Sequence, residues 1–130
     1  IFAGHVSEQR KHEILAESWL MLLPSLKEGW GIVVGEAGSH GTPTVAYASA
    51  GGTRESIDHG RSGVLAADEA EFTAVVRRLV ESPTERERLG EGARAMSHSF
   101  SWTHSQNAFA QVLADALEGR RVSVEDPDVE

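Results

Sequence analysis

The chain has 130 residues, of which 40% are hydrophobic and 25% charged, so it can bury one hydrophobic core and is too short for two. The formal net charge of −8 argues against a surface that binds nucleic acid or an anionic membrane, and no segment approaches the length of a membrane span. The lack of cysteine excludes disulfides and thiolate zinc sites. Because no export signal is present, we expect a cytoplasmic protein, or one at the cytoplasmic face of a membrane at full length.

The first part of the chain alternates apolar runs with a helical pattern. The apolar run at residues 1–4 predicts a buried strand. Because this strand begins at the first residue without an initiator Met, we expect the sequence to be a fragment of a longer chain. A helix capped by Ser7 is expected over residues 7–18. The apolar run at residues 20–23 predicts a strand that is buried on both faces.

The middle of the chain continues this alternation. A helix is expected over residues 32–40, where Gly35 and Gly38 lower the helix propensity but allow another backbone to come close. Strands are expected at residues 44–47 and 64–66. Strands and helices that alternate with short connections predict an α/β fold, a parallel sheet with flanking helices.

From residue 68 onward the pattern is helical only. Helices are predicted over residues 69–81, from Pro83 to residue 98, and after an N-cap at Ser101. The second of these alternates Glu and Arg, which we interpret as a solvated face with ion pairs inside the helix. The acidic tail at residues 120–130 is expected to be disordered.

Two acids, Glu28 and Glu36, flank a glycine-rich turn between a predicted strand and a predicted helix. This geometry presents backbone N–H groups and two carboxylates to a phosphorylated ligand. We interpret the two acids as contacts to two parts of one ligand. From residue chemistry alone, the alternative is a solvated loop acid and a helix-face acid.

Six short motifs follow one another along this part of the chain. They are Pro24-Ser25, Glu28-Gly29-Trp30-Gly31-Ile32-Val33, Glu36-Ala37, Gly41-Thr42-Pro43-Thr44-Val45, Gly51-Gly52-Thr53-Arg54-Glu55 and Gly63-Val64-Leu65. In this order and spacing they resemble the donor-binding half of the family 4 retaining glycosyltransferases. That large group has the GT-B fold and takes sugars from nucleotide-diphosphate donors. The likeness covers roughly residues 1–117.

The resemblance implies a fold and an activity. The fold is a partial Rossmann-like domain over residues 1–119, the C-terminal half of a GT-B fold with a helical C-terminal region. The activity is that of a retaining, hexosyltransferase-like enzyme at full length, with a nucleotide-diphospho-sugar as donor and no metal or other cofactor. Family enzymes use a front-face mechanism, in which the leaving phosphate helps to deprotonate the acceptor. The motifs identify neither the nucleotide base and the sugar of the donor nor the acceptor.

The resemblance also assigns roles to residues. Glu28 would bind hydroxyls of the donor sugar as the catalytic residue, without being a covalent nucleophile, and Glu36 would accept the ribose hydroxyls. Both the loop at residues 24–31 and the loop at residues 48–54 follow predicted strands, where parallel sheets bind ligands. The residues implied in binding the sugar and diphosphate are Gly29, Trp30, Gly31, Ile32, Val33, Gly51 and Gly52.

Parts of the family pattern lie outside this chain. The basic residues that grip the diphosphate belong to preceding strand-helix units, and the acceptor site belongs to an N-terminal domain. We therefore expect the chain alone to be inactive and to need that domain as its partner. In the usual sheet order 3-2-1-4-5-6, the strand at residues 20–23 would be the fourth and would have an open edge. A strand at an open edge has backbone groups without hydrogen-bond partners. We therefore expect the sheet to rearrange, or to pair with another chain or with a second copy of this one.

Several alternatives stay open at this point. Two other functions are the alternatives to a glycosyltransferase: a non-catalytic nucleotide-binding or interaction module, and a GT-B sugar-nucleotide epimerase. Trp30 has two interpretations, a hydrophobic anchor and a wall of the ligand site. The spacing of the six histidines matches no zinc motif, and His40 is interpreted as a helix cap. Arg54 is interpreted as exposed, with a contact to the donor phosphate as the alternative.

Overall fold

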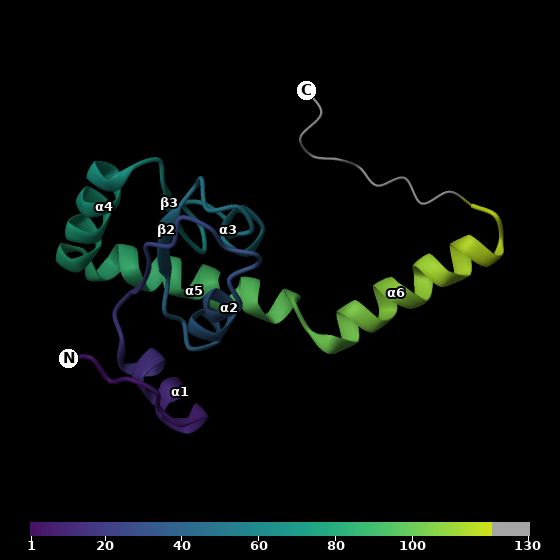
Figure 1. Cartoon of the computed structure of the whole chain (residues 1–130), viewed down its shortest axis with the longest axis horizontal. Helices are drawn as coiled ribbons and strands as arrows, with labels where there is room; N and C mark the ends of the chain where they lie inside the picture. Colours follow the sequence, from purple (N-terminus) through teal and green to yellow (C-terminus); the bar gives the residue numbers. More distant parts are fainter. Residues whose placement is uncertain (121–130) are drawn as a thin grey trace. The chain divides into compact units, whose positions relative to one another are not determined.

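The computed structural model describes residues 1–120 (Figure 1). Residues 1–99 form one compact unit, and residues 100–120 belong to a second. Of the tail predicted at residues 120–130, residues 121–130 lie outside the described residues. The elements are α1 (Glu8–Glu17), β1 (Met21–Leu23), α2 (Ile32–Ser39), β2 (Thr44–Tyr47), α3 (Thr53–Ser56), β3 (Gly63–Ala66), α4 (Glu69–Glu81), α5 (Pro83–Ser99) and α6 (Trp102–Leu117).

The three strands form one parallel sheet in the order β1-β2-β3. Leu22 of β1 is in register with Val45 of β2, which is in register with Val64 of β3. The predicted α/β fold and its strands at residues 20–23, 44–47 and 64–66 are therefore confirmed. The expected burial of the first strand on both faces is wrong, because Leu22 of β1 is 44% exposed. Since all strands run the same way, their carboxyl ends lie at one edge of the sheet, where ligands bind in this class of fold.

Helices cover both faces of the sheet, because alternate side chains of a strand point to opposite sides. One hydrophobic cluster joins the sheet to α4 and α5, and it is made of Val45, Val64, Val75, Leu79 and Leu89. The other cluster joins the sheet to α2, and it is made of Leu23, Val34, Ala46 and Ile57. The sheet is thus buried on two sides, which fixes the loops at its edge.

The strand expected at residues 1–4 is wrong. These residues form no strand, and the side chains of Ile1 and Phe2 are fully exposed. An apolar run becomes a strand only when another strand accepts its backbone hydrogen bonds, and the three-stranded sheet does not reach this segment. The apolar pattern of residues 1–4 carries no information about a pairing partner.

The helix starts follow the predicted caps. The Ser7 hydroxyl accepts a hydrogen bond from the Arg10 N–H at 3.2 Å, and the Ser101 hydroxyl accepts one from the His104 N–H at 3.1 Å. His40 is the C-cap of α2, as expected. The short helix α3 was not predicted, since the sequence indicated only a loop at residues 48–54. No residue of α6 is buried.

The arginines of α5 behave differently from the expected pattern. They donate to carbonyl groups of neighbouring segments: Arg86 to Leu79 at 2.7 Å, and Arg94 to His40 at 3.0 Å. An ion pair of 3.3 Å joins Arg78 of α4 to Glu85, between two helices and not within one. Because α5 packs against α2, α4 and β3, its polar side chains reach the open carbonyls at the ends of α2 and α4.

Candidate functional site

Two loops meet at the carboxyl edge of the sheet. The loop after β1 and the loop after β2 pair through a parallel bridge between Glu28 and Gly51. The Glu28 N–H donates to the Ala50 carbonyl at 2.6 Å, and the Gly52 N–H donates to the Glu28 carbonyl at 3.2 Å. These backbone hydrogen bonds on both sides of Glu28 fix the position from which its side chain projects.

A pocket of about 500 Å³ lies at this junction. Three of the residues that line it, Glu28, Gly29 and Gly51, belong to the predicted site. Lys27, Ser49 and Ala50 complete the lining. Sequence reasoning missed Lys27 and Ser49, although one directly precedes Glu28 and the other follows β2. The pocket therefore combines one carboxylate, one ammonium group and one hydroxyl with exposed backbone.

Gly52 shows how closely the two loops approach. A Cβ atom at Gly52 would lie 1.7 Å from the Gly29 carbonyl oxygen and 2.9 Å from the Trp30 Cα. At Gly29 a Cβ would meet no atom within 4 Å. The lack of a side chain at Gly52 thus allows the two loops to come into contact, whereas Gly29 leaves open space beside the main chain.

The turn before α2 is shaped by Gly31, whose φ of +74° lies in the left-handed region. It is the N-cap of α2 and makes no side-chain capping bond. The first N–H groups of a helix have no partner within the helix, so those of Ile32 and Val33 point out of its positive end. The Val33 side chain packs against the hydrophobic core, and the Ile32 side chain is 74% exposed. Trp30 beside them is 37% exposed.

The second acid of the predicted pair lies apart from the pocket. Glu36 is in the middle of α2 and does not belong to the lining of the pocket that holds Glu28. Its carboxylate accepts a hydrogen bond from the Lys11 ammonium group of α1 at 2.7 Å. This contact, with a second one to Glu8, raises the pKa of Lys11. Sequence reasoning gave no sign of this partner, 25 residues away.

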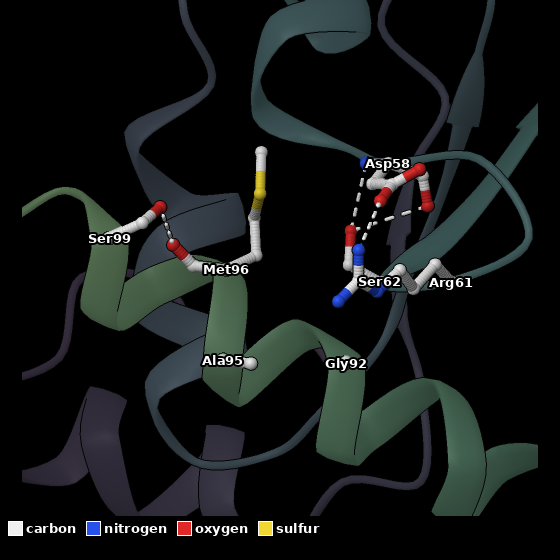
Figure 2. Close-up of a pocket in the computed structure, with 7 residues that line it drawn as sticks. All are labelled: Asp58, Arg61, Ser62, Gly92, Ala95, Met96 and Ser99. Atoms are coloured by element: carbon white, nitrogen blue, oxygen red, sulfur yellow. Dashed lines mark hydrogen bonds and ion pairs between the residues drawn. The ribbon is translucent and has the colours of Figure 1, made fainter.

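A second pocket, of about 220 Å³, lies between α5 and the turn before β3 (Figure 2). Its polar groups bind one another: the Ser62 hydroxyl accepts from the Asp58 N–H at 2.9 Å, and Arg61 pairs with Asp58 at 3.7 Å. A Cβ at Gly92 of α5 would lie 2.0 Å from the Arg61 carbonyl oxygen. This pocket therefore lies where α5 packs against the turn before β3, and few of its polar groups are free to bind a ligand.

The remaining polar candidates make structural contacts. Arg54 is exposed, and its Nε donates to the Ala48 carbonyl at 2.9 Å. His12 and His40 form a pair with 2.9 Å between ring nitrogens. Within residues 1–120, no three His, Asp or Glu side chains are grouped as metal ligands would be. Across the same residues, no helix has both the length and the apolar character needed to cross a membrane.

Parallel strands with helices on both faces, and a glycine turn that opens a helix at their carboxyl edge, define a Rossmann-like α/β protein. The family model described as "Glycosyl transferases group 1" matches residues 1–96. The chain belongs to this family, and the resemblance drawn from the six motifs is confirmed.

Relatives of known function match over most of this chain. A D-inositol 3-phosphate glycosyltransferase of Nocardioides sp. is 37% identical over 106 residues, which are 80% of this chain and 23% of the relative. Glycogen synthase of Mycobacterium tuberculosis is 33% identical over 123 residues, which are 92% of this chain and 30% of the relative. The chain thus spans about a quarter of the length of such relatives.

Solved structures share the fold. Sucrose-phosphate synthase from Thermosynechococcus elongatus matches with a TM-score of 0.77 and 22% identity, over 90% of this chain and 30% of that chain. Anabaena Alr3699/HepE in complex with UDP matches with a TM-score of 0.70 and 26% identity, over 79% of this chain and 29% of that chain. The same Anabaena protein has also been solved with UDP and glucose.

Proposed function

We propose that this chain is the donor-binding part of a retaining glycosyltransferase, which transfers a sugar from a nucleotide-diphospho-sugar to an acceptor. The observation that carries the proposal is the pairing of the Glu28 loop with the Gly51 loop at the carboxyl edge of the sheet. Family membership supports it, as do the UDP and glucose bound to the Anabaena protein. The complete reaction would also need the acceptor site and the basic residues of the remaining enzyme.

The pocket supports a role for Glu28 in binding the sugar. A half-buried carboxylate accepts hydrogen bonds from sugar hydroxyls, and its backbone is held on both sides by the loop after β2. The open space beside Gly29 admits a sugar ring against the main chain. Lys27 lines the same pocket and adds a positive charge that favours an anionic group nearby.

The start of α2 supports binding of the diphosphate. The N–H groups of Ile32 and Val33, together with the positive end of the helix dipole, favour a phosphate that becomes more negative as the bond to the sugar breaks. In a front-face reaction that phosphate takes the proton of the acceptor hydroxyl, which attacks the same face of the sugar carbon that the phosphate leaves. Glu28 then holds the sugar and forms no covalent bond. Glu36, one helical turn further along, serves the ribose.

Substitution of the two acids tests this division of roles. In the protein that carries this chain at its natural length, Glu28→Ala should lower kcat by about a hundredfold or more, because Glu28 acts on the reacting sugar. Glu36→Ala should mainly raise the KM for the donor, by about tenfold, because it removes an acceptor for ribose hydroxyls. Initial rates with UDP-, GDP- and ADP-sugars measure both effects.

Glu91→Ala is the matched control, because Glu91 is exposed on α5 outside the pocket and its loss should leave both constants unchanged. Activity equal to that of the unmodified protein in both acid variants would contradict the roles assigned to them. Nucleotide binding without transfer to any acceptor would favour the non-catalytic module. Inversion of a hydroxyl on the donor sugar without transfer would favour the epimerase.

A further inference from the structure

The strongest unexplained contact near the proposed site is the ion pair between α1 and α2. The Lys11 Nζ donates to Glu36 Oε1 at 2.7 Å and also contacts Glu8 Oε2 at 2.7 Å. The side chains of Lys11 and Glu36 are only 29% and 27% exposed, whereas that of Glu8 is 80% exposed. Lys11 is thus held close to Glu36 in a partly shielded position, with Glu8 on its open side.

Other contacts hold α1 in place without Lys11. The Thr42 hydroxyl, just after α2, donates to the Leu15 carbonyl at 2.7 Å, and this bond is buried. The Leu15 side chain is 7% exposed. The His12 Nδ1 lies 2.9 Å from the His40 Nε2 at the end of α2. Because α1 is fixed by these groups, the ammonium group of Lys11 is brought to Glu36 by the fold.

A carboxylate offers about four lone-pair positions, and the Lys11 ammonium group uses one of them on Oε1. The remaining positions can accept two hydroxyl donors, which is what a ribose presents. A glutamate side chain has rotatable bonds that must be fixed before it can bind two vicinal hydroxyls, and an ion pair made in advance fixes them. The pKa of Lys11 is raised by Glu36 and Glu8, so the ammonium form is present at neutral pH.

We propose that Lys11 is a positioning residue that orients the Glu36 carboxylate for the ribose diol of the nucleotide donor. The inference rests on the proposed function, since it assumes that Glu36 meets the ribose. It extends the site beyond the family motifs to α1. The proposed role differs from that of an ordinary ion pair between two helices. Such a pair would stabilise the fold without affecting how a ribose is recognised.

The experiment compares nucleotides with and without the ribose hydroxyls. The full chain is titrated with UDP, GDP and ADP, each beside its 2′,3′-dideoxy analogue, and the ratio of the two dissociation constants gives the ribose preference. Lys11→Met keeps a long, helix-favouring side chain and removes the charge. It should lower the ribose preference by at least about fivefold. Lys11→Arg, which keeps a cationic donor, should restore most of the preference.

Two further variants make the result specific. Arg10→Met removes one positive charge from the same helix, where Arg10 pairs with Glu13 at 3.0 Å, and should leave the preference unchanged. Glu36→Gln should itself lower the preference, and adding Lys11→Met to it should cause no further loss, because Lys11 acts through Glu36. If Lys11→Met disturbs α1, Lys11→Gln, which also favours a helix and lacks the charge, replaces it with the same expected loss of ribose preference.

The outcomes separate this inference from the proposed function. If Lys11→Met weakens ribose and dideoxy nucleotides equally, Lys11 is only a structural partner of Glu36 and the inference is wrong. If the unmodified chain binds nucleotides but shows no ribose preference, the ribose role of Glu36 fails and the inference fails with it. If it binds none of them, the donor-binding function itself is contradicted.

Discussion

Gly52 and Gly29 lie against each other where the two loops of the proposed site meet, and their surroundings are opposite. A Cβ at Gly52 would strike the Gly29 carbonyl at 1.7 Å, whereas a Cβ at Gly29 would meet open space. The clash involves backbone on both sides, so it cannot be relieved by turning a side chain. The two residues therefore provide a matched pair of substitutions within a single contact.

We predict that Gly52→Ala destabilises the chain by about 1–3 kcal/mol, because the two loops must move apart. Gly29→Ala should change the stability by less than about 0.5 kcal/mol, as expected for a site with free space. Thermal or urea unfolding followed by circular dichroism measures both values. Equal stability of the two variants would show that the loops are not in contact as described.

Among single residues, the sequence predicted part of the lining of this pocket. It placed Glu28 and Gly51 together because both follow strands whose carboxyl ends meet at one edge. It did not find Lys27 or Ser49, since neither residue type has a fixed role next to such a turn. Nor could it find the contact of Glu36 with Lys11, because that depends on how two helices pack.

At the scale of elements, α2 carries two glycines with different surroundings. A Cβ at Gly38 would lie 2.8 Å from the Ala93 carbonyl oxygen of α5, so α2 and α5 touch there through their backbones. A Cβ at Gly35 would meet no atom within 4 Å. The expected close approach of another backbone is therefore confirmed at Gly38. At Gly35 no neighbouring group requires a glycine, although glycine lowers the helix propensity there.

Alanine at these two positions should have effects of opposite sign. Gly35→Ala should stabilise the chain by up to about 1 kcal/mol through helix propensity alone. Gly38→Ala should destabilise it by about 1–3 kcal/mol, because α5 must move away. Urea unfolding of both variants tests this. A destabilising Gly35→Ala would mean that another group occupies the space beside α2.

Most elements could be predicted because their signals are local. The helix α4 has a complete apolar stripe and an N-cap, Asp68, whose carboxylate accepts from the Glu71 N–H at 2.8 Å. The failures depend on distant partners. Residues 1–4 have the composition of a strand but no neighbouring strand, and Arg86 and Arg94 bind carbonyls that lie beside them only in the folded chain.

The chain as a whole matches only part of the length of its relatives. It covers 23% of the inositol 3-phosphate glycosyltransferase and 30% of glycogen synthase. Strand β1 lies at an edge of the sheet formed within residues 1–120, and its Leu22 is 44% exposed. The proposed donor pocket is nevertheless formed entirely within residues 1–99, so its binding can be tested in this chain.

We propose above that the junction of the Glu28 and Gly51 loops binds a nucleotide-diphospho-sugar. The most direct measurement is a titration of the ¹⁵N-labelled chain with UDP-, GDP- and ADP-sugars up to about 10 mM. A pocket with one basic residue in its lining, Lys27, should bind such a donor in the millimolar range. We predict saturable shifts of the amides at residues 28–33 and 51 with at least one donor. Shifts confined to residues 58–62 and 92–99 around the pocket of Figure 2, or no saturable shift with any donor, would contradict the account.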